Sequence, residues 1–171
     1  KLAGTPPGEI EDALVKVFTQ IRPDVVITHE HNGITNHPDH IKMCYAATFG
    51  FQTYAGLRAD ENPDDPEPPK LYYACFPETV ISYLVKVKRF PVEMFDRPIL
   101  GTGDKRITTV IDIKRFAGTK RKALESHVTQ LPILEKYLTN DQFFRKEYFV
   151  LRMVGQNEVF LGKNDRVSDR L

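Results

Sequence analysis

The chain has 171 residues, of which 41% are hydrophobic and 27% are charged, and these proportions exclude an intrinsically disordered chain. Its length suits one compact domain, and we expect a single domain over residues 1–171. The formal net charge of +1 gives no strong field of one sign, so we expect no nucleic-acid partner. No apolar run reaches the length of a transmembrane helix. Cys44 and Cys75 form neither a disulfide framework nor a zinc knuckle, so we expect a cytoplasmic protein.

The first part of the chain predicts a helix, a strand, a loop and a second helix. Residues 10–21 repeat apolar side chains at helical spacing, with Thr5 as a candidate cap and Pro23 as the stop. Residues 24–28 contain a Val-Val-Ile run, which is typical of a buried parallel strand. A polar loop follows over residues 29–36, and Pro38 fits the start of a helix that continues to residue 54.

The remaining elements continue the alternation of strands and helices. After a proline-rich acidic connector at 60–70, we expect strands at 71–76 and 107–111, helices at 78–89, 116–130 and 133–138, and a last apolar segment at 148–154. In the helix at 116–130, Ala123, Leu124 and Val128 are predicted to face inward and the cations at 120–122 to face solvent. The alternation predicts an α/β fold, with a mostly parallel sheet flanked by helices.

Four of the five histidines lie within residues 29–40: His29, His31, His37 and His40. Their loop follows the buried strand, where open α/β sheets place their ligands. In the segment His37-Pro38-Asp39-His40, proline starts the helix and the two imidazoles are three residues apart, hence on one side of it. Neutral imidazole is a common zinc ligand, and its second ring nitrogen needs an acceptor such as the Asp39 carboxylate. The cluster therefore favours metal binding over helix capping alone.

Two segments carry a family resemblance. The stretch RPDVVITHEHNGITNHPDHIKMCYAA resembles the second signature of the LmbE/PIG-L N-acetylglucosaminyl deacetylases, in which a strand and a glycine-containing loop lead into HPDH. Further on, IDIKRFAGTKRKALESHVTQ resembles a helix of the same family that ends in His-x-x-Gln. The resemblance spans roughly residues 9–130 and implies a Rossmann-like fold.

The resemblance also implies a reaction and a site. It implies a zinc-dependent hydrolase that removes the acetyl group from an N-acetylated amino sugar through metal-activated water. His40 would be a Zn²⁺ ligand (other divalent transition metals would serve), His37 would stabilise the oxyanion or protonate the leaving amine, and Asp39 would orient His37. His127 lies in the later resembling segment, and we interpret it as a structural histidine. The resemblance leaves a trimer or a hexamer open, and the substrate-binding residues are unknown.

The chain departs from the family pattern in one large respect. The family takes its other two zinc ligands and its general base from a His-Pro-Asp-Asp turn after the first strand, and the sequence contains no such motif. The expected domain is therefore incomplete at its N-terminal side. Two alternatives follow: a catalytically incomplete family member that acts as a binding or assembly module, and a metal-binding loop that uses all four clustered histidines without hydrolysis.

Overall fold

The computed structural model describes residues 2–132, 141–160 and 168–171. The predicted helix at 133–138 lies outside the described residues. Two free cysteines, Cys44 and Cys75, are both buried, as expected for core positions. Within the described part of the chain, the helices are all too short or too polar to cross a membrane.

The N-terminal elements form in the predicted order, with different ends. They are η1 (Leu2–Gly4), α1 (Glu9–Ile21), β1 (Val25–His29), α2 (Gly33–Asn36) and α3 (Pro38–Glu61). The cap of α1 is Gly8 and not Thr5, because the backbone N–H of Gly8 donates to the Glu11 carboxylate at 3.0 Å, while the Thr5 N–H is used by the Leu2 carbonyl. Helix α3 runs past residue 54 because alanine, leucine and arginine continue to favour helix.

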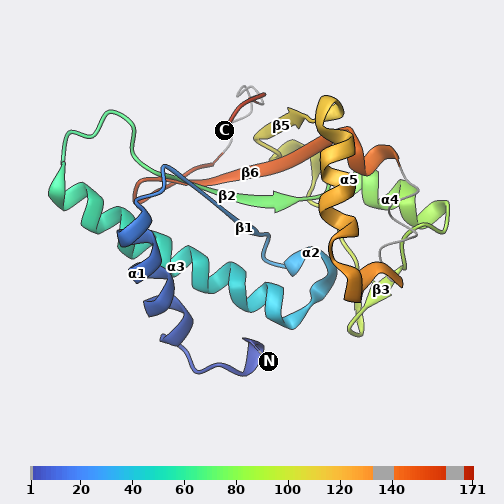
Figure 1. The fold of residues 1–171 in the computed structure, drawn as a ribbon, viewed down its shortest axis with the longest axis horizontal. Helices are drawn as coiled ribbons and strands as arrows, with labels where there is room; N and C mark the ends of the chain where they lie inside the picture. Colours follow the sequence, from blue (N-terminus) through green and yellow to red (C-terminus); the bar gives the residue numbers. More distant parts are fainter. Residues whose placement is uncertain (1, 133–140, 161–167) are drawn as a thin grey trace.

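The central sheet has the strand order β1-β2-β6-β5, with β7 paired to β6 (Figure 1). Its further strands are β2 (Lys70–Cys75), β5 (Thr109–Asp112), β6 (Lys146–Val154) and β7 (Asn157–Glu158). The α/β class is confirmed. Parallel pairing, however, joins only β1 to β2 among the described strands. The pairings of β6 with β2, β5 and β7 are antiparallel, because β6 returns between β2 and β5 in the opposite direction.

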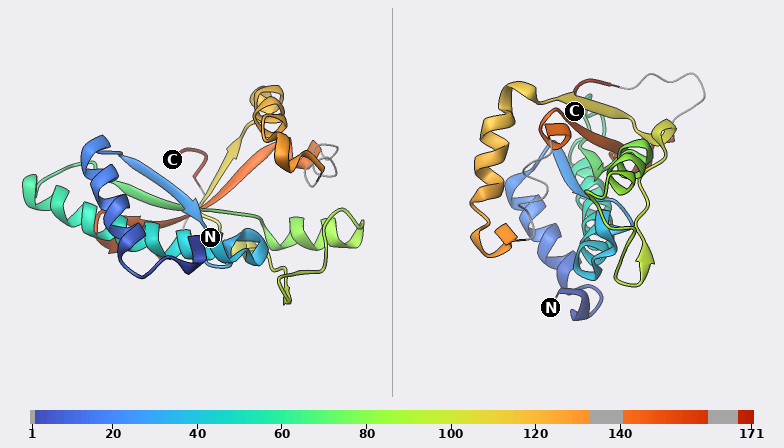
Figure 2. Two further views of the ribbon diagram at one scale, coloured as in Figure 1. Left: turned by 60° about the horizontal axis from the view of Figure 1, so that its bottom comes forward. Right: turned by 90° about the vertical axis from the view of Figure 1, so that its right-hand side faces the viewer.

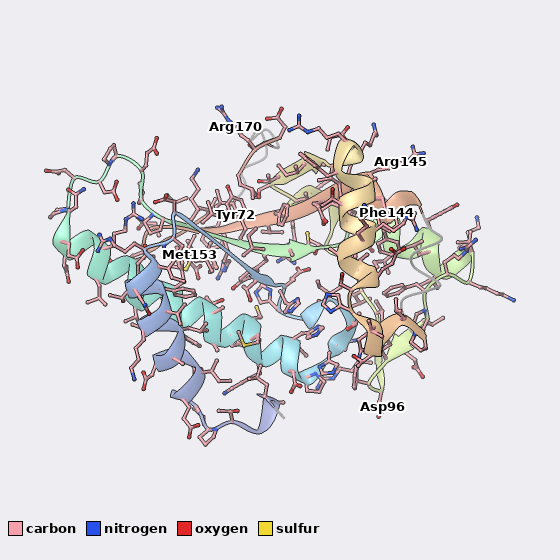
Figure 3. The ribbon with its side chains drawn as sticks, in the orientation of Figure 1. Tyr72, Asp96, Phe144, Arg145, Met153 and Arg170 are labelled. Carbon is pink, nitrogen blue, oxygen red and sulfur yellow. The ribbon has the colours of Figure 1, made fainter. Side chains whose placement is uncertain are left out.

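The segment between β2 and β5 is more regular than predicted. It contains α4 (Glu78–Lys86), the two strands of a small hairpin, β3 (Glu93–Met94) and β4 (Arg97–Pro98), and the turn η2 (Asp104–Arg106). Figure 3 places Asp96 at the outer tip of this hairpin, on the side of the molecule where α2 lies. The hairpin thus stands beside the loop that carries the histidines.

Helices α1 and α3 pack on one face of the sheet and close the main core. Its buried residues come from both helices and from β1, β2 and β6: Phe18, Val26, Cys44, Phe51, Tyr54, Ala55, Leu71, Tyr73 and Met153. A second cluster joins α4 to the hairpin region through Ile81, Leu84, Phe90 and Ile99. Burial of the side chains of the main core holds α3 against β1.

Helix α5 (Ala117–Glu125) differs from the prediction in two respects: the burial of its apolar residues and the contacts of its cations. It follows η3 (Lys114–Phe116), precedes η4 (Val128–Gln130) and lies across the sheet from α1 and α3 (Figure 2). None of its residues is buried, and Val128 is 70% exposed. Four charged residues leave this helix no continuous apolar stripe. Its cations hold it instead: Lys120 pairs with Glu147 at 2.6 Å, and Arg121 lies 4.3 Å from the centre of the Phe144 ring in η5 (Asp141–Phe144).

Candidate functional site

The histidine cluster lies where β1 ends and α3 begins. His29 is the last residue of β1, and His40 lies in the first turn of α3. Because β1 is paired in parallel with β2, the cluster sits at the carboxyl end of a parallel pair, the position at which α/β sheets bind ligands.

Three imidazoles are stacked in this cluster. The His29 and His40 rings lie 4.2 Å apart with an angle of 9° between their planes, and the His37 and His40 rings lie 4.7 Å apart at 28°. His40 is therefore the middle ring. Burial, followed by the charge of His40, lowers the pKa of His29 below its ordinary value, which favours the neutral imidazole that binds metals.

The hydrogen bond of His40 fixes which nitrogen is free. Its Nδ1 lies 3.1 Å from the Gly33 carbonyl oxygen. A carbonyl only accepts, so Nδ1 carries the proton and the Nε2 lone pair of the neutral ring is open to a ligand. Gly33 has φ +61°, and a Cβ there would come within 2.8 Å of the His40 Cβ. Glycine is thus required for this contact.

His37 uses its nitrogens in the opposite way. It caps α3, and its Nδ1 accepts a hydrogen bond from the backbone N–H of Asp39 at 3.1 Å. The neutral ring therefore carries its proton on Nε2 and presents a donor. The Asp39 carboxylate accepts from the Ala3 N–H at 2.7 Å. In the structure, the backbone of Asp39 and not its carboxylate contacts His37.

The loop between His29 and His37 is held in an unusual conformation by asparagine side chains. Ile34 and Asn36 have φ values of 67° and 61°, which are rare for residues with a side chain. The Asn36 amide donates to the carbonyls of Met94, Arg97 and Pro98 at 3.1–3.4 Å. These bonds tie the loop to the β3–β4 hairpin, and strained backbone of this kind is often found at functional sites.

The hairpin brings an aromatic ring to His37. Phe95 lies edge-on to the His37 ring, with 5.0 Å between the centroids. Sequence reasoning missed both Phe95 and Asn36, because their partners lie about 60 residues away along the chain. Within the loop itself, the Asn32 side chain caps α2 by accepting from the Ile34 N–H.

Glu30 and His31, which follow His29 in the chain, make their contacts outside the stack. The His31 ring is not part of the stack; it lies edge-on to Tyr73, with the ring centroids 5.1 Å apart. Glu30 is buried, and its carboxylate accepts a short hydrogen bond from the Thr102 hydroxyl. The burial of Glu30 could not be predicted, because Thr102 is remote from it in the chain. His127 is exposed and shares no ring contact with the cluster in the described residues.

The described residues do not form a complete metal site. No group of three or more histidine, cysteine, aspartate or glutamate side chains is placed to hold one ion within ranges 2–132, 141–160 and 168–171. The Nε2 of His40 is the nitrogen that fits a ligand role, since Gly33 holds its tautomer. A closed zinc site needs about four ligands, so the others are not in this set.

Sequence comparisons identify the family of the chain. Residues 1–50 match the family model PIG-L, described as GlcNAc-PI de-N-acetylase. A 1D-myo-inositol 2-acetamido-2-deoxy-alpha-D-glucopyranoside deacetylase of Thermobispora bispora is 34% identical over 133 residues, which are 72% of this chain and 43% of the relative. The chain belongs to the LmbE/PIG-L family.

Other curated relatives of this LmbE/PIG-L chain carry the same name. The protein from Thermomonospora curvata is 29% identical over 84% of this chain and 54% of its own length. That from Streptomyces scabiei is 33% identical over 72% of this chain and 42% of its own length. The chain thus spans about half the length of the curated relatives it matches.

Proposed function

We propose that this LmbE/PIG-L chain is part of a metal-dependent N-deacetylase that hydrolyses the acetamide of an N-acetylglucosamine-type sugar. The observation that carries the proposal is the pair of opposite tautomers in the stack: His40 offers a free Nε2 lone pair, and His37 offers an Nε2–H donor. The names of the relatives, which are deacetylases of an acetamido sugar, support the same reaction.

Each histidine then has a distinct role in the proposed reaction. His40 would be one ligand of a divalent ion, of which Zn²⁺ is the best match to imidazole. Such an ion supplies Lewis acidity toward an amide carbonyl. His37 would donate a hydrogen bond from Nε2 to the developing oxyanion. To give a proton to the departing amine, its ring would first have to be protonated on both nitrogens. Asp39 would act on His37 through its backbone N–H, which holds Nδ1.

His40→Ala in the complete protein tests the proposal. We expect loss of bound metal, measured as zinc per chain by mass spectrometry, together with a loss of acetate release of at least about a hundredfold, the size expected for removing a metal-site interaction. His31→Ala is the matched control, because His31 lies outside the stack, and it should keep its metal. Unchanged acetate release by His40→Ala would refute the proposal.

The two alternatives predict different results for the same variants. A binding or assembly module without activity would release no acetate even with its metal content restored. A metal-binding loop built from four histidines would lose metal in His31→Ala as well as in His40→Ala. The edge-on contact of His31 with Tyr73 argues against the second alternative, because that ring is turned to a different neighbour. The cytoplasmic location and the trimeric or hexameric state stay predictions.

A further inference from the structure

A cavity of about 270 Å³ lies next to the end of β1. Its lining includes Glu30 and His31, which follow His29 in the chain, together with Tyr73, Thr108, Val150 and Leu151. The volume is near the lower end of the roughly 300–1,000 Å³ typical of ligand pockets. It suits a compact chemical group and not a polymer.

The charged groups of this cavity are mainly cationic. Lys105 and Arg106 come from η2 and Arg152 comes from β6, so three cations from two elements line one space. Glu30 is the one anionic side chain in the described lining, and its carboxylate already accepts from Thr102. The lining residues alone therefore carry a formal charge of +2, and Glu158, outside the lining, pairs with Arg152.

The cations have unused hydrogen-bonding capacity. The Nε of Arg152 is buried and has no partner among the described residues, although its Nη2 pairs with Glu158. Lys105 and Arg106 are exposed, and the ion pairs found in the described residues do not include them. A buried guanidinium donor without an acceptor is costly unless a ligand satisfies it.

Two of these cations also affect the pKa of His31. Burial is the largest cause that lowers the pKa of His31; Glu30 opposes it, and Arg152 and Arg106 lower the pKa further. Both arginines therefore act on His31, which lines the cavity.

We propose that this cavity binds a phosphate group, with Arg106, Arg152 and Lys105 as its ligands. A phosphate anion complements the net positive charge of the lining, and arginine offers paired donors to its oxygens. The further step, that the phosphate belongs to the sugar whose acetamide lies at the histidine stack, rests on the proposed deacetylase function.

Calorimetric titration of the purified protein with inorganic phosphate tests the cavity without using activity. We expect binding that weakens with added salt and falls about tenfold or more in Arg106→Gln, the size expected for losing a hydrogen bond to a charged group. Lys86→Gln is the control, because Lys86 is an exposed cation at the end of α4, and it should bind as the parent does. No phosphate binding, or equal loss in both variants, would overturn the proposal.

Two further experiments test the chemical class of the ligand and its link to the substrate. Acetate titrated in the same way should bind more weakly than phosphate; equal affinity would replace phosphate by a carboxylate and so overturn the assignment. For the substrate step, a phosphate-bearing N-acetylglucosamine should have a lower KM than the neutral sugar, and Arg106→Gln should raise that KM with little effect on kcat. Phosphate binding without any deacetylation would leave the cavity in place and refute the proposed function alone.

Discussion

His37 and His40 show how one residue type can be given two chemical identities by its neighbours. A carbonyl oxygen on Nδ1 of His40 leaves a lone pair at Nε2, whereas a backbone N–H on Nδ1 of His37 leaves a proton at Nε2. The difference is set by the local backbone, since Gly33 supplies the carbonyl and Asp39 the amide. Substitutions that move this backbone should therefore change the site without touching an imidazole.

Gly33→Ala is the sharpest test of that dependence. The new Cβ would meet the His40 Cβ at 2.8 Å and would occupy a left-handed conformation at φ +61°. We expect the free energy of unfolding to fall by about 1–2 kcal/mol and metal affinity to fall with it, measured by urea denaturation and by metal titration. Gly118→Ala is the control, because nothing lies within 4 Å of its Cβ position. A Gly33→Ala protein that keeps both properties would show that the contact is dispensable.

Among the elements, the β3–β4 hairpin has a larger effect on the site than its size suggests. Two two-residue strands carry no core of their own, yet three of their carbonyls accept from Asn36 and their turn presents Phe95 to His37. The hairpin therefore fixes the ring that donates in the proposed reaction.

Phe95→Ala should loosen that ring. An aromatic contact contributes about 0.5–1.5 kcal/mol, so we expect a several-fold fall in kcat and a changed imidazole signal of His37 by NMR. Global stability should change little, because Phe95 is 48% exposed. Phe116→Ala, at a similarly exposed ring (50%) that contacts Arg115, is the matched control. An unaltered His37 signal in Phe95→Ala would contradict the positioning role.

Elements set by local pattern could be predicted from the sequence, and those set by distant partners could not. The apolar run of β1, the proline at the start of α3 and the histidines between them lie within a short stretch, so their order was predictable. The placement of the hairpin, the hydrogen bonds of Asn36 and the burial of Glu30 depend on partners about 60–70 residues away. For α5, a helix was predicted correctly, but its inward-facing side was not. The helix is attached through Lys120 and Arg121, which give no apolar signal.

For the molecule as a whole, the thiol of Cys75 links stability to pH. Burial raises the pKa of Cys75 to about 12 from its ordinary value of 9.0. Below pH 9 the thiol is neutral in both the folded and unfolded states and has no effect. Above pH 9 the unfolded chain loses the proton more readily than the folded one, so the free energy of unfolding must fall as pH rises.

Denaturation at pH 7.5 and 10.5 measures this linkage. The parent should lose on the order of 2 kcal/mol more between the two pH values than Cys75→Ala does, since the variant lacks the titrating group. Comparing the two proteins cancels the lysines and tyrosines that titrate in the same range. An equal loss in both would mean that the thiol ionises freely in the folded protein.

The cap of α3 has a consequence for the timing of the proposed reaction. His37 holds the first turn of that helix through a nitrogen that must be unprotonated to accept from Asp39. A ring protonated on both nitrogens cannot accept, so it must release the amide. Protonation of His37 would therefore remove this cap from the first turn of α3, the turn that carries His40. The charge of His37 and the conformation of the backbone at His40 are thus coupled.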